Sequence, residues 1–153
     1  MRDAGQDFAE SVPAEGADQP RPSPADGPVS FPTGMATGAL ITHVFVGVPV
    51  TNFASARTWY EQFFGRPPDV VPNEDEAVWQ VTTTGLIYIV ADRQRAGRGL
   101  VVIAVSDLER CLADLEARGV QIPPTETAGN EPMNVVFHDP DGNTIKVFAA
   151  PET

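Results

Sequence analysis

The chain has 153 residues and a mass of 16.4 kDa, which gives room for one ordinary domain and a tail. Apolar residues make up 42% of it, so it can bury a core and is not disordered throughout. No apolar run approaches the roughly 20 residues that cross a bilayer, and no signal-peptide pattern is present at the start. The single cysteine, Cys111, can form neither an internal disulfide nor a cysteine-based zinc site. These features are typical of a soluble cytoplasmic protein.

The formal net charge is −11, from ten Lys and Arg against 21 Asp and Glu. This charge argues against nucleic acid as a partner, because phosphate binding needs a basic surface. The basic residues are nine Arg and one Lys. Any lysine chemistry therefore belongs to Lys146.

Residues 1–38 differ in composition from the rest of the chain. They hold six of the fifteen Pro and five Gly, with only two aromatic residues. Such a segment cannot bury enough apolar surface to offset its ordering entropy, so we predict a disordered N-terminal tail. Two alternatives stay open: the tail docks onto a partner, or translation starts near Met35 and residues 1–34 are a misassigned extension.

Residues 39–150 are predicted to form one domain, and the first half of its pattern runs to residue 92. Residues 41–48 alternate as a half-buried strand does. Residues 52–64 have an apolar stripe at helical spacing, with Thr51 or Asn52 as N-cap and Gly65 as C-cap. Two strands follow, near residues 77–83 and 86–91, joined by a short turn.

The same order of elements recurs in residues 100–149. Residues 100–105 read as a strand, and Ser106 with Glu109 forms a capping box that opens a helix ending at Gly119. A short segment near residues 120–122 follows. Two strands, near 133–138 and 143–149, are joined by a turn at residues 139–142. The chain thus repeats the order strand, helix, strand, strand, strand.

This repeat and four short motifs resemble the vicinal oxygen chelate superfamily, which includes glyoxalase I, bleomycin-resistance proteins and extradiol dioxygenases. The motifs are ITHV at 41–44, TWYEQFFG at 58–65, VSDL at 105–108 and FHDPDGN at 137–143. The resemblance implies an α+β fold in which two βαβββ modules, residues 41–92 and 100–149, form one curled mixed-sheet cup. Taken alone, the last motif is also an ordinary turn sequence, and the aromatic residues of the helix are also ordinary core residues.

In metal-using relatives, the resemblance implies four ligands that point into the cup, one from the first and one from the last strand of each module. They are His or Gln, Glu, His and Glu. Counting back five residues from Val48 and from Val105 places the first-strand positions at His43 and Leu100, and the last-strand positions are Tyr88 and Lys146. One ligand of four remains, and a lysine ammonium repels a divalent ion. We therefore expect no catalytic metal and no other cofactor.

By strand alternation, ten side chains share the inward face of the cup: His43, Phe45, Leu86, Tyr88, Val90, Leu100, Val102, Ala104, Lys146 and Phe148. Trp79 is expected to stack at its edge. The result is an apolar bowl with a few polar groups, which is typical of a small-molecule pocket. The candidate ligand-binding residues are His43, Phe45, Trp79, Tyr88, Leu100, Val102, Lys146 and Phe148.

Each polar group in the cup also has a purely structural interpretation. His43 is equally well explained as a hydrogen-bonded residue that remains from the ligand set and contacts no ligand. Tyr88 is equally well explained as a packed aromatic residue whose hydroxyl forms a hydrogen bond within the protein. Lys146 is explained either by a salt bridge to a neighbouring carboxylate or as the counter-ion of a carboxylate or phenolate ligand.

The leading functional hypothesis is a metal-independent protein that binds an amphiphilic or aromatic small molecule. The first alternative is an enzyme of the same superfamily, a lyase, isomerase or dioxygenase-like protein that is metal-free or has non-standard ligands. The second is a structural member whose cup is filled by Phe45, Phe148 and Trp79. Because many relatives dimerise, and dimerisation covers exposed sheet edges, we also expect a homodimer.

Overall fold

The computed structural model describes residues 40–129 and 131–151. The predicted N-terminal tail, residues 1–38, and the alternative start near Met35 lie outside the described residues. Within them, no helix is long and apolar enough to span a membrane.

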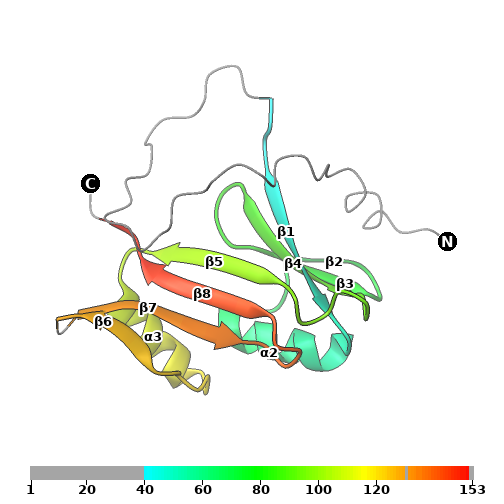
Figure 1. The fold of residues 1–153 in the computed structure, drawn as a ribbon. Helices are drawn as coiled ribbons and strands as arrows, with labels where there is room; N and C mark the ends of the chain where they lie inside the picture. Colours follow the sequence, from blue (N-terminus) through cyan, green and yellow to red (C-terminus); the bar gives the residue numbers. More distant parts are fainter. Residues whose placement is uncertain (1–39, 130, 152–153) are drawn as a thin grey trace, which may run out of the picture. The chain divides into compact units, whose positions relative to one another are not determined.

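The first module contains one helix and four strands (Figure 1). Its elements are β1 (Val44–Val50), α2 (Phe53–Phe64), β2 (Val70–Asn73), β3 (Glu76–Gln80) and β4 (Gly85–Ala91). The strands form a sheet in the order β1-β4-β3-β2, in which β1 and β4 are parallel and the other pairs antiparallel. A parallel pair needs a long crossover, and α2 lies within that connection.

The second module repeats this arrangement. Its elements are β5 (Leu100–Val105), α3 (Leu108–Ala117), β6 (Thr125–Ala128), β7 (Glu131–His138) and β8 (Thr144–Ala149). The strand order is β5-β8-β7-β6, with β5 and β8 parallel. The predicted α+β class and the doubled βαβββ module are therefore confirmed. Both sheets are open, so the described chain does not close the curled cup by itself.

The helix ends show one confirmed and one wrong prediction. Asn52 caps α2 by accepting a hydrogen bond from the Ser55 backbone N–H at 3.0 Å, and Gly65 ends the helix in the left-handed conformation, with φ at 80°. The predicted capping box at Ser106 is wrong. The N-cap of α3 is Asp107, whose carboxylate accepts from the Arg110 N–H, because the chain enters the helix one residue later than predicted.

Several strand boundaries also differ from the predicted ones. The first strand runs over Val44–Val50 instead of residues 41–48, and β3 begins at Glu76. Residues 120–122 form no strand, and the short strand of that region is β6. Strand β2, at Val70–Asn73, was not predicted, because its four residues are exposed and show no alternation of apolar and polar side chains.

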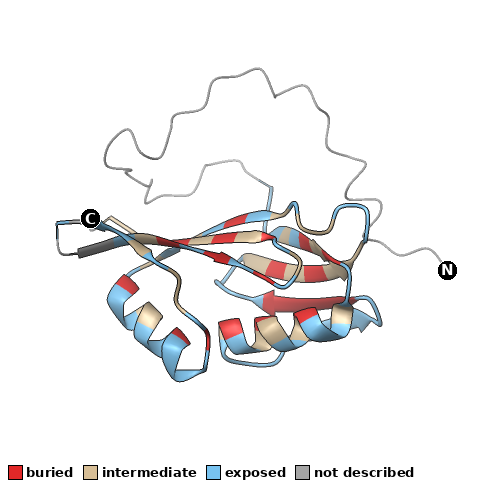
Figure 2. Cartoon of the chain, turned by 60° about the horizontal axis from the view of Figure 1, so that its bottom comes forward, coloured by how far each residue is buried: buried red, intermediate tan, exposed pale blue. Residues whose placement is uncertain are grey.

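Both helices lie on the same side of the strands (Figure 2). Alternate strand residues, such as Ile87, Ile89, Ile145 and Val147, are at most 4% exposed and form one cluster with buried residues of both helices. Two open sheets therefore share a single core. The opposite side of the strands carries the remaining residues of the alternation, which we call the outer face.

The turn between β7 and β8 joins the two modules through a buried hydrogen-bond network, which we call the clasp (residues 139–143). The Asp139 carboxylate, 5% exposed, accepts hydrogen bonds from the Tyr60 hydroxyl at 2.7 Å and from the Asn143 side chain at 2.9 Å. Fully buried Asn143 also donates to the Pro49 carbonyl at 2.8 Å and accepts from the Gly99 N–H at 2.6 Å. These bonds join β7 and β8 to β1 and α2 of the first module.

Further contacts between the modules lie beside the clasp. Asp141 accepts hydrogen bonds from the Thr51 backbone N–H at 3.1 Å and from its hydroxyl at 2.5 Å. The Arg118 guanidinium donates to the Gln62 and Phe63 carbonyls at the end of α2, at 2.8 and 2.6 Å. A cation at a helix C-terminus satisfies free carbonyls and complements the helix dipole.

The clasp predicts that removing the Tyr60 hydroxyl makes the fold less stable. We expect Tyr60→Phe to lower the free energy of unfolding by about 1.5 to 3 kcal/mol, because the buried carboxylate loses one of its hydrogen-bond donors. Tyr88→Phe is the matched control, since no hydrogen bond of the Tyr88 hydroxyl is found among the described residues. Urea unfolding measures both values, and equal losses for the two variants would contradict the role of the clasp.

The same contact predicts a dependence on pH. Burial, and next the charge of Asp139, raise the pKa of Tyr60 well above its ordinary value of 10.0. The unfolded tyrosine therefore ionises above about pH 10 while the folded one stays protonated, so stability is lost as the pH rises through that range. Tyr60→Phe should show a smaller loss of stability than the wild-type chain over the same range.

Candidate functional site

Nine of the ten cup residues that alternation predicted, all except His43, lie on the outer face of their sheets. In module one, Phe45, Gly47 and Pro49 pair in register with Leu86, Tyr88 and Val90 of β4. In module two, Leu100, Val102 and Ala104 pair with Thr144, Lys146 and Phe148 of β8. Their neighbours in each strand, such as Ile89 and Val147, are buried against the helices. The side chains of the predicted set therefore lie on the side away from the core.

Large apolar side chains of the outer face are exposed. Phe45 is 56% exposed, Leu100 68% and Val102 55%. A surface of this kind marks a place where a ligand or another protein chain binds. Because Phe45 stands in solvent, it does not fill a closed cup.

Trp79 lies elsewhere than predicted. It is fully buried on the helix side of β3, where its ring packs against Tyr60 and Phe64, and its indole N–H donates to the Arg66 carbonyl at 3.0 Å. Its register partner, Ile87, belongs to the core. The expectation that Trp79 stacks at the edge of the cup is therefore wrong, because strand alternation places it on the opposite side from Tyr88.

Tyr88 is the main polar residue of the outer face in module one. Its ring lies over Gly47, where an added Cβ would stand 2.7 Å from the hydroxyl oxygen. Burial raises the pKa of Tyr88, and the nearby charge of Glu76 raises it further. The phenol therefore stays protonated near neutral pH, where it can donate a hydrogen bond.

Glu76 was missed by the sequence prediction. It pairs with Val90 across β3 and β4, so it shares the outer face with Tyr88, and it is 8% exposed. Its carboxylate accepts a hydrogen bond from the Asn73 side chain at 3.1 Å. Strand alternation would have placed residues 76, 78 and 80 on one face, but the predicted strand began at residue 77 and so left Glu76 out.

Lys146 is the polar residue of the outer face in module two. It lies on β8 between Val102 of β5 and Val136 of β7, and it is half-buried. None of the ion pairs among the described residues includes it. Of the two interpretations of Lys146, the salt bridge to a neighbouring carboxylate is therefore not found in the part of the chain that the structure describes.

The observed strands change one of the four positions at which the resemblance places metal ligands. Strand β1 ends at Val50, not at Val48, so counting back five residues gives Phe45 instead of His43. The register supports this count, because Val50 pairs with Ala91 as Val105 pairs with Ala149, and the N-cap follows two residues later in both modules. The four positions are then Phe45, Tyr88, Leu100 and Lys146.

His43 itself lies one residue before β1. It is exposed, and its Nδ1 is 3.0 Å from the Thr42 hydroxyl. Across residues 40–129 and 131–151, no group of three or more His, Cys, Asp or Glu side chains is placed to hold a metal ion. The donors that a divalent metal prefers are therefore not gathered around His43 in this part of the chain.

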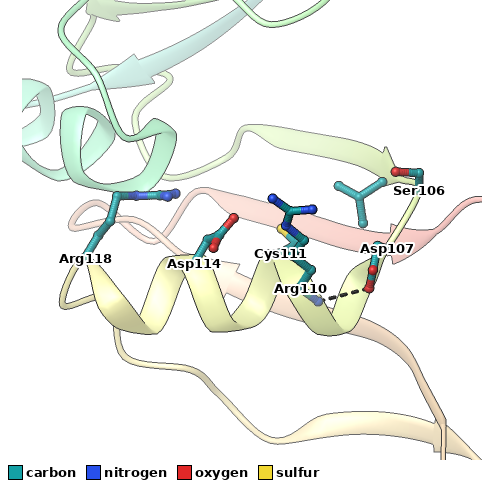
Figure 3. Close-up of a pocket in the computed structure, with 7 residues that line it drawn as sticks. Ser106, Asp107, Arg110, Cys111, Asp114 and Arg118 are labelled. Atoms are coloured by element: carbon teal, nitrogen blue, oxygen red, sulfur yellow. Dashed lines mark hydrogen bonds between the residues drawn. The ribbon is translucent and has the colours of Figure 1, made fainter.

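A second candidate site is an open groove of about 570 Å³ along α3 (Figure 3). It is lined by Val105, Ser106, Asp107, Arg110, Cys111, Asp114 and Arg118. Arg118 is already bound to carbonyls at the end of α2. The Arg110 guanidinium has no ion pair among the described residues, and two carboxylates stand beside it along the groove. The groove is thus polar and of mixed charge, unlike the outer face.

Cys111 in this groove is predicted to react slowly. Burial raises the pKa of its thiol, against a smaller opposing effect of Arg118. Since the thiolate is the nucleophile, we expect iodoacetamide at pH 8 to alkylate the folded chain several-fold more slowly than the urea-unfolded chain. Mass spectrometry over time measures both rates. A folded rate equal to or above the unfolded one would show an activated thiol and contradict this prediction.

The comparisons with known proteins agree with this architecture. Residues 40–147 match the family model of the glyoxalase/bleomycin resistance protein/dioxygenase superfamily. A glyoxalase/bleomycin resistance protein from Catenulispora acidiphila is 37% identical, with a TM-score of 0.67 over 71% of this chain and 98% of its own. None of the curated proteins matches the chain.

Two more distant solved structures share the fold. A bleomycin-binding protein complexed with bleomycin is 17% identical, with a TM-score of 0.57 over 71% of this chain and 98% of its own. A lactoylglutathione lyase from Agrobacterium tumefaciens is 14% identical, with a TM-score of 0.56 over 78% and 95%. The family match covers both βαβββ modules, and the chain therefore belongs to the glyoxalase/bleomycin resistance protein/dioxygenase superfamily.

Proposed function

We propose that this protein binds an amphiphilic or aromatic small molecule on the outer face of its sheets, without a metal. The observation that carries the proposal is the identity of the four positions where metal-using relatives are expected to hold their ligands. They are occupied by Phe45, Tyr88, Leu100 and Lys146. Two are hydrocarbons with no lone pair, and one is a cation at neutral pH. Such a set disfavours a divalent ion.

The chemistry of the outer face supports a ligand with an apolar body. Most of its side chains are apolar, and a few polar groups, among them Tyr88 and Lys146, are placed to orient a bound molecule. The architecture is compatible with this role, because the bleomycin-binding protein of the same fold is complexed with a small molecule.

An enzymatic function is the second candidate, and the observation that favours it is the pair Tyr88 and Glu76 on one face. Burial and the Glu76 charge hold the phenol protonated, so it suits the role of a hydrogen-bond donor better than that of a general base. We therefore favour binding over a metal-free lyase or isomerase.

We also propose that the protein is a homodimer. The exposed side chains of Phe45 and Leu100 leave apolar surface in water, and a two-fold copy covers the same patch on both chains. Because each sheet is open, a second chain would complete the wall of a pocket that one chain provides only in part.

The binding proposal is tested by a thermal-shift screen of aromatic acids and cationic antibiotics in the presence of a metal chelator. A ligand at about 100 times its dissociation constant stabilises the folded state by about 2.7 kcal/mol, which corresponds to a rise of several degrees in Tm. We expect at least one such rise, and the chelator should not reduce it.

Two variants locate the binding. Val102→Asp places a charge on the outer face and should abolish the shift, whereas Val81→Asp, at an exposed turn position between β3 and β4, should leave it unchanged. A shift that disappears with chelator and returns with zinc, nickel, manganese or iron would refute metal independence. A screen without any shift would remove the support for a binding function.

The oligomeric state is predicted separately. Light scattering of the purified chain should give a mass close to twice 16.4 kDa. We expect Leu100→Asp to shift the equilibrium toward the monomer, because an isologous interface places the new charge on both chains. A monomeric mass for the wild-type chain at all accessible concentrations would refute the dimer.

A further inference from the structure

Lys146 has an unusual position for a lysine. It is the chain's single lysine, and no other Lys or Arg lies in a strand of the described chain. Its neighbours in β8, Ile145 and Val147, are each 1% exposed in the core. Its side chain therefore lies on the outer face, between Val102 and Val136, which are 55% and 36% exposed.

Among the residues whose side chains the structure describes, the acidic groups on the outer face are engaged elsewhere. Among the described residues, Lys146 belongs to no ion pair. Glu126, the acidic residue on the same face of the neighbouring strands, lies on the outermost strand and accepts a hydrogen bond from Asn134 at 3.2 Å. Glu76 belongs to the other sheet and binds Asn73. A half-buried charge among apolar groups is costly unless something pairs with it.

Protection of a sheet edge does not explain this lysine. Natural proteins place lysine on edge strands to prevent pairing with other chains. Strand β8, however, lies inside its sheet, between β5 and β7. Lysine is also depleted in strands, so the sequence gains no strand propensity from it.

We infer that Lys146 binds the anionic group of the ligand, so that the ligand class is a compound with an apolar aromatic body and a carboxylate, sulfonate or phenolate. The ammonium provides the charge, and Val102 and Val136 on either side provide the surface for the apolar body. This inference rests on the proposed binding function. The net charge of −11 by itself favours cationic ligands. We give more weight to Lys146, because a direct contact at the site is stronger than the screened field of charges spread over the surface.

The test compares two dyes that share one aromatic skeleton. Anilinonaphthalene sulfonate is anionic, and N-phenylnaphthylamine is the same molecule without the sulfonate. Both fluoresce when they enter an apolar site. We expect the wild-type chain to bind the sulfonate about tenfold more tightly than the neutral dye, as one partly exposed charge-assisted contact allows.

The variants separate the outer face from the groove along α3. Lys146→Met keeps an unbranched side chain that is one atom shorter and removes the charge, and it should bring the two affinities within about twofold of each other. Lys146→Arg should keep the preference for the sulfonate. Arg110→Met removes an equal charge from the groove and should have no effect. Cooperative thermal unfolding of each variant shows that it is folded.

Three outcomes overturn the inference. Equal affinity of the wild-type chain for both dyes refutes an anion anchor but leaves apolar binding intact. Loss of the preference in Arg110→Met, but not in Lys146→Met, assigns the anion to the groove. Binding of neither dye refutes the anchor together with the proposed function.

Because the chain has a single lysine, its acylation rate measures independently whether the dye binds at Lys146. Acylation of Lys146 by an activated ester is followed by mass spectrometry, which separates it from acylation of the N-terminal amine. We expect saturating sulfonate dye to slow the reaction severalfold in the wild-type chain and in Arg110→Met. An unchanged rate with the dye bound would place the dye elsewhere and overturn the assignment.

Discussion

The buried carboxylate of Asp139 is the group on which the arrangement of the two modules depends. Half-domains of about fifty residues bury too little surface to be stable alone, so the modules must share one core. Asp139 receives the Tyr60 hydroxyl from α2 and the amide of Asn143, which in turn binds the Pro49 carbonyl at the end of β1. A buried charge is tolerated because several donors surround it, and removing one of them leaves it underpaired.

The clasp also determines which surface remains for binding. It joins the ends of β1 and β7 to α2, both helices lie on one side of the strands, and alternate residues of β1, β3, β4, β5, β7 and β8 are buried in the same core. The other half of each alternation then forms the outer face. Its apolar side chains cannot be buried by the chain's own helices, and this is why Phe45, Leu100 and Val102 stay exposed.

The order of most elements and the faces of most strands could be predicted from the sequence, because those depend on local periodicity, whereas the α+β class and the complete βαβββ module followed from the resemblance. Errors arose where the exact limits or register of a strand mattered, in the count of the ligand positions and in the face assigned to Trp79. The alternation of valines continues through Val50, so ending the strand at Val48 moved the first ligand position by two residues, from Phe45 to His43. Long-range contacts such as Tyr60 with Asp139, 79 residues apart, leave no periodic signal and were not predictable.

With the first position at Phe45 instead of His43, none of the four positions offers an imidazole or a carboxylate to a metal. A histidine at the first position would still provide one metal-binding nitrogen. With Phe45, each module pairs a hydrocarbon on its first strand with a hydrogen-bond donor on its last, Tyr88 in one and Lys146 in the other. Two donors on an apolar surface complement an acceptor on an apolar ligand. In line with the proposed function, we therefore expect the positions that the resemblance assigns to metal ligands to favour an anionic or oxygen-rich group of a bound molecule.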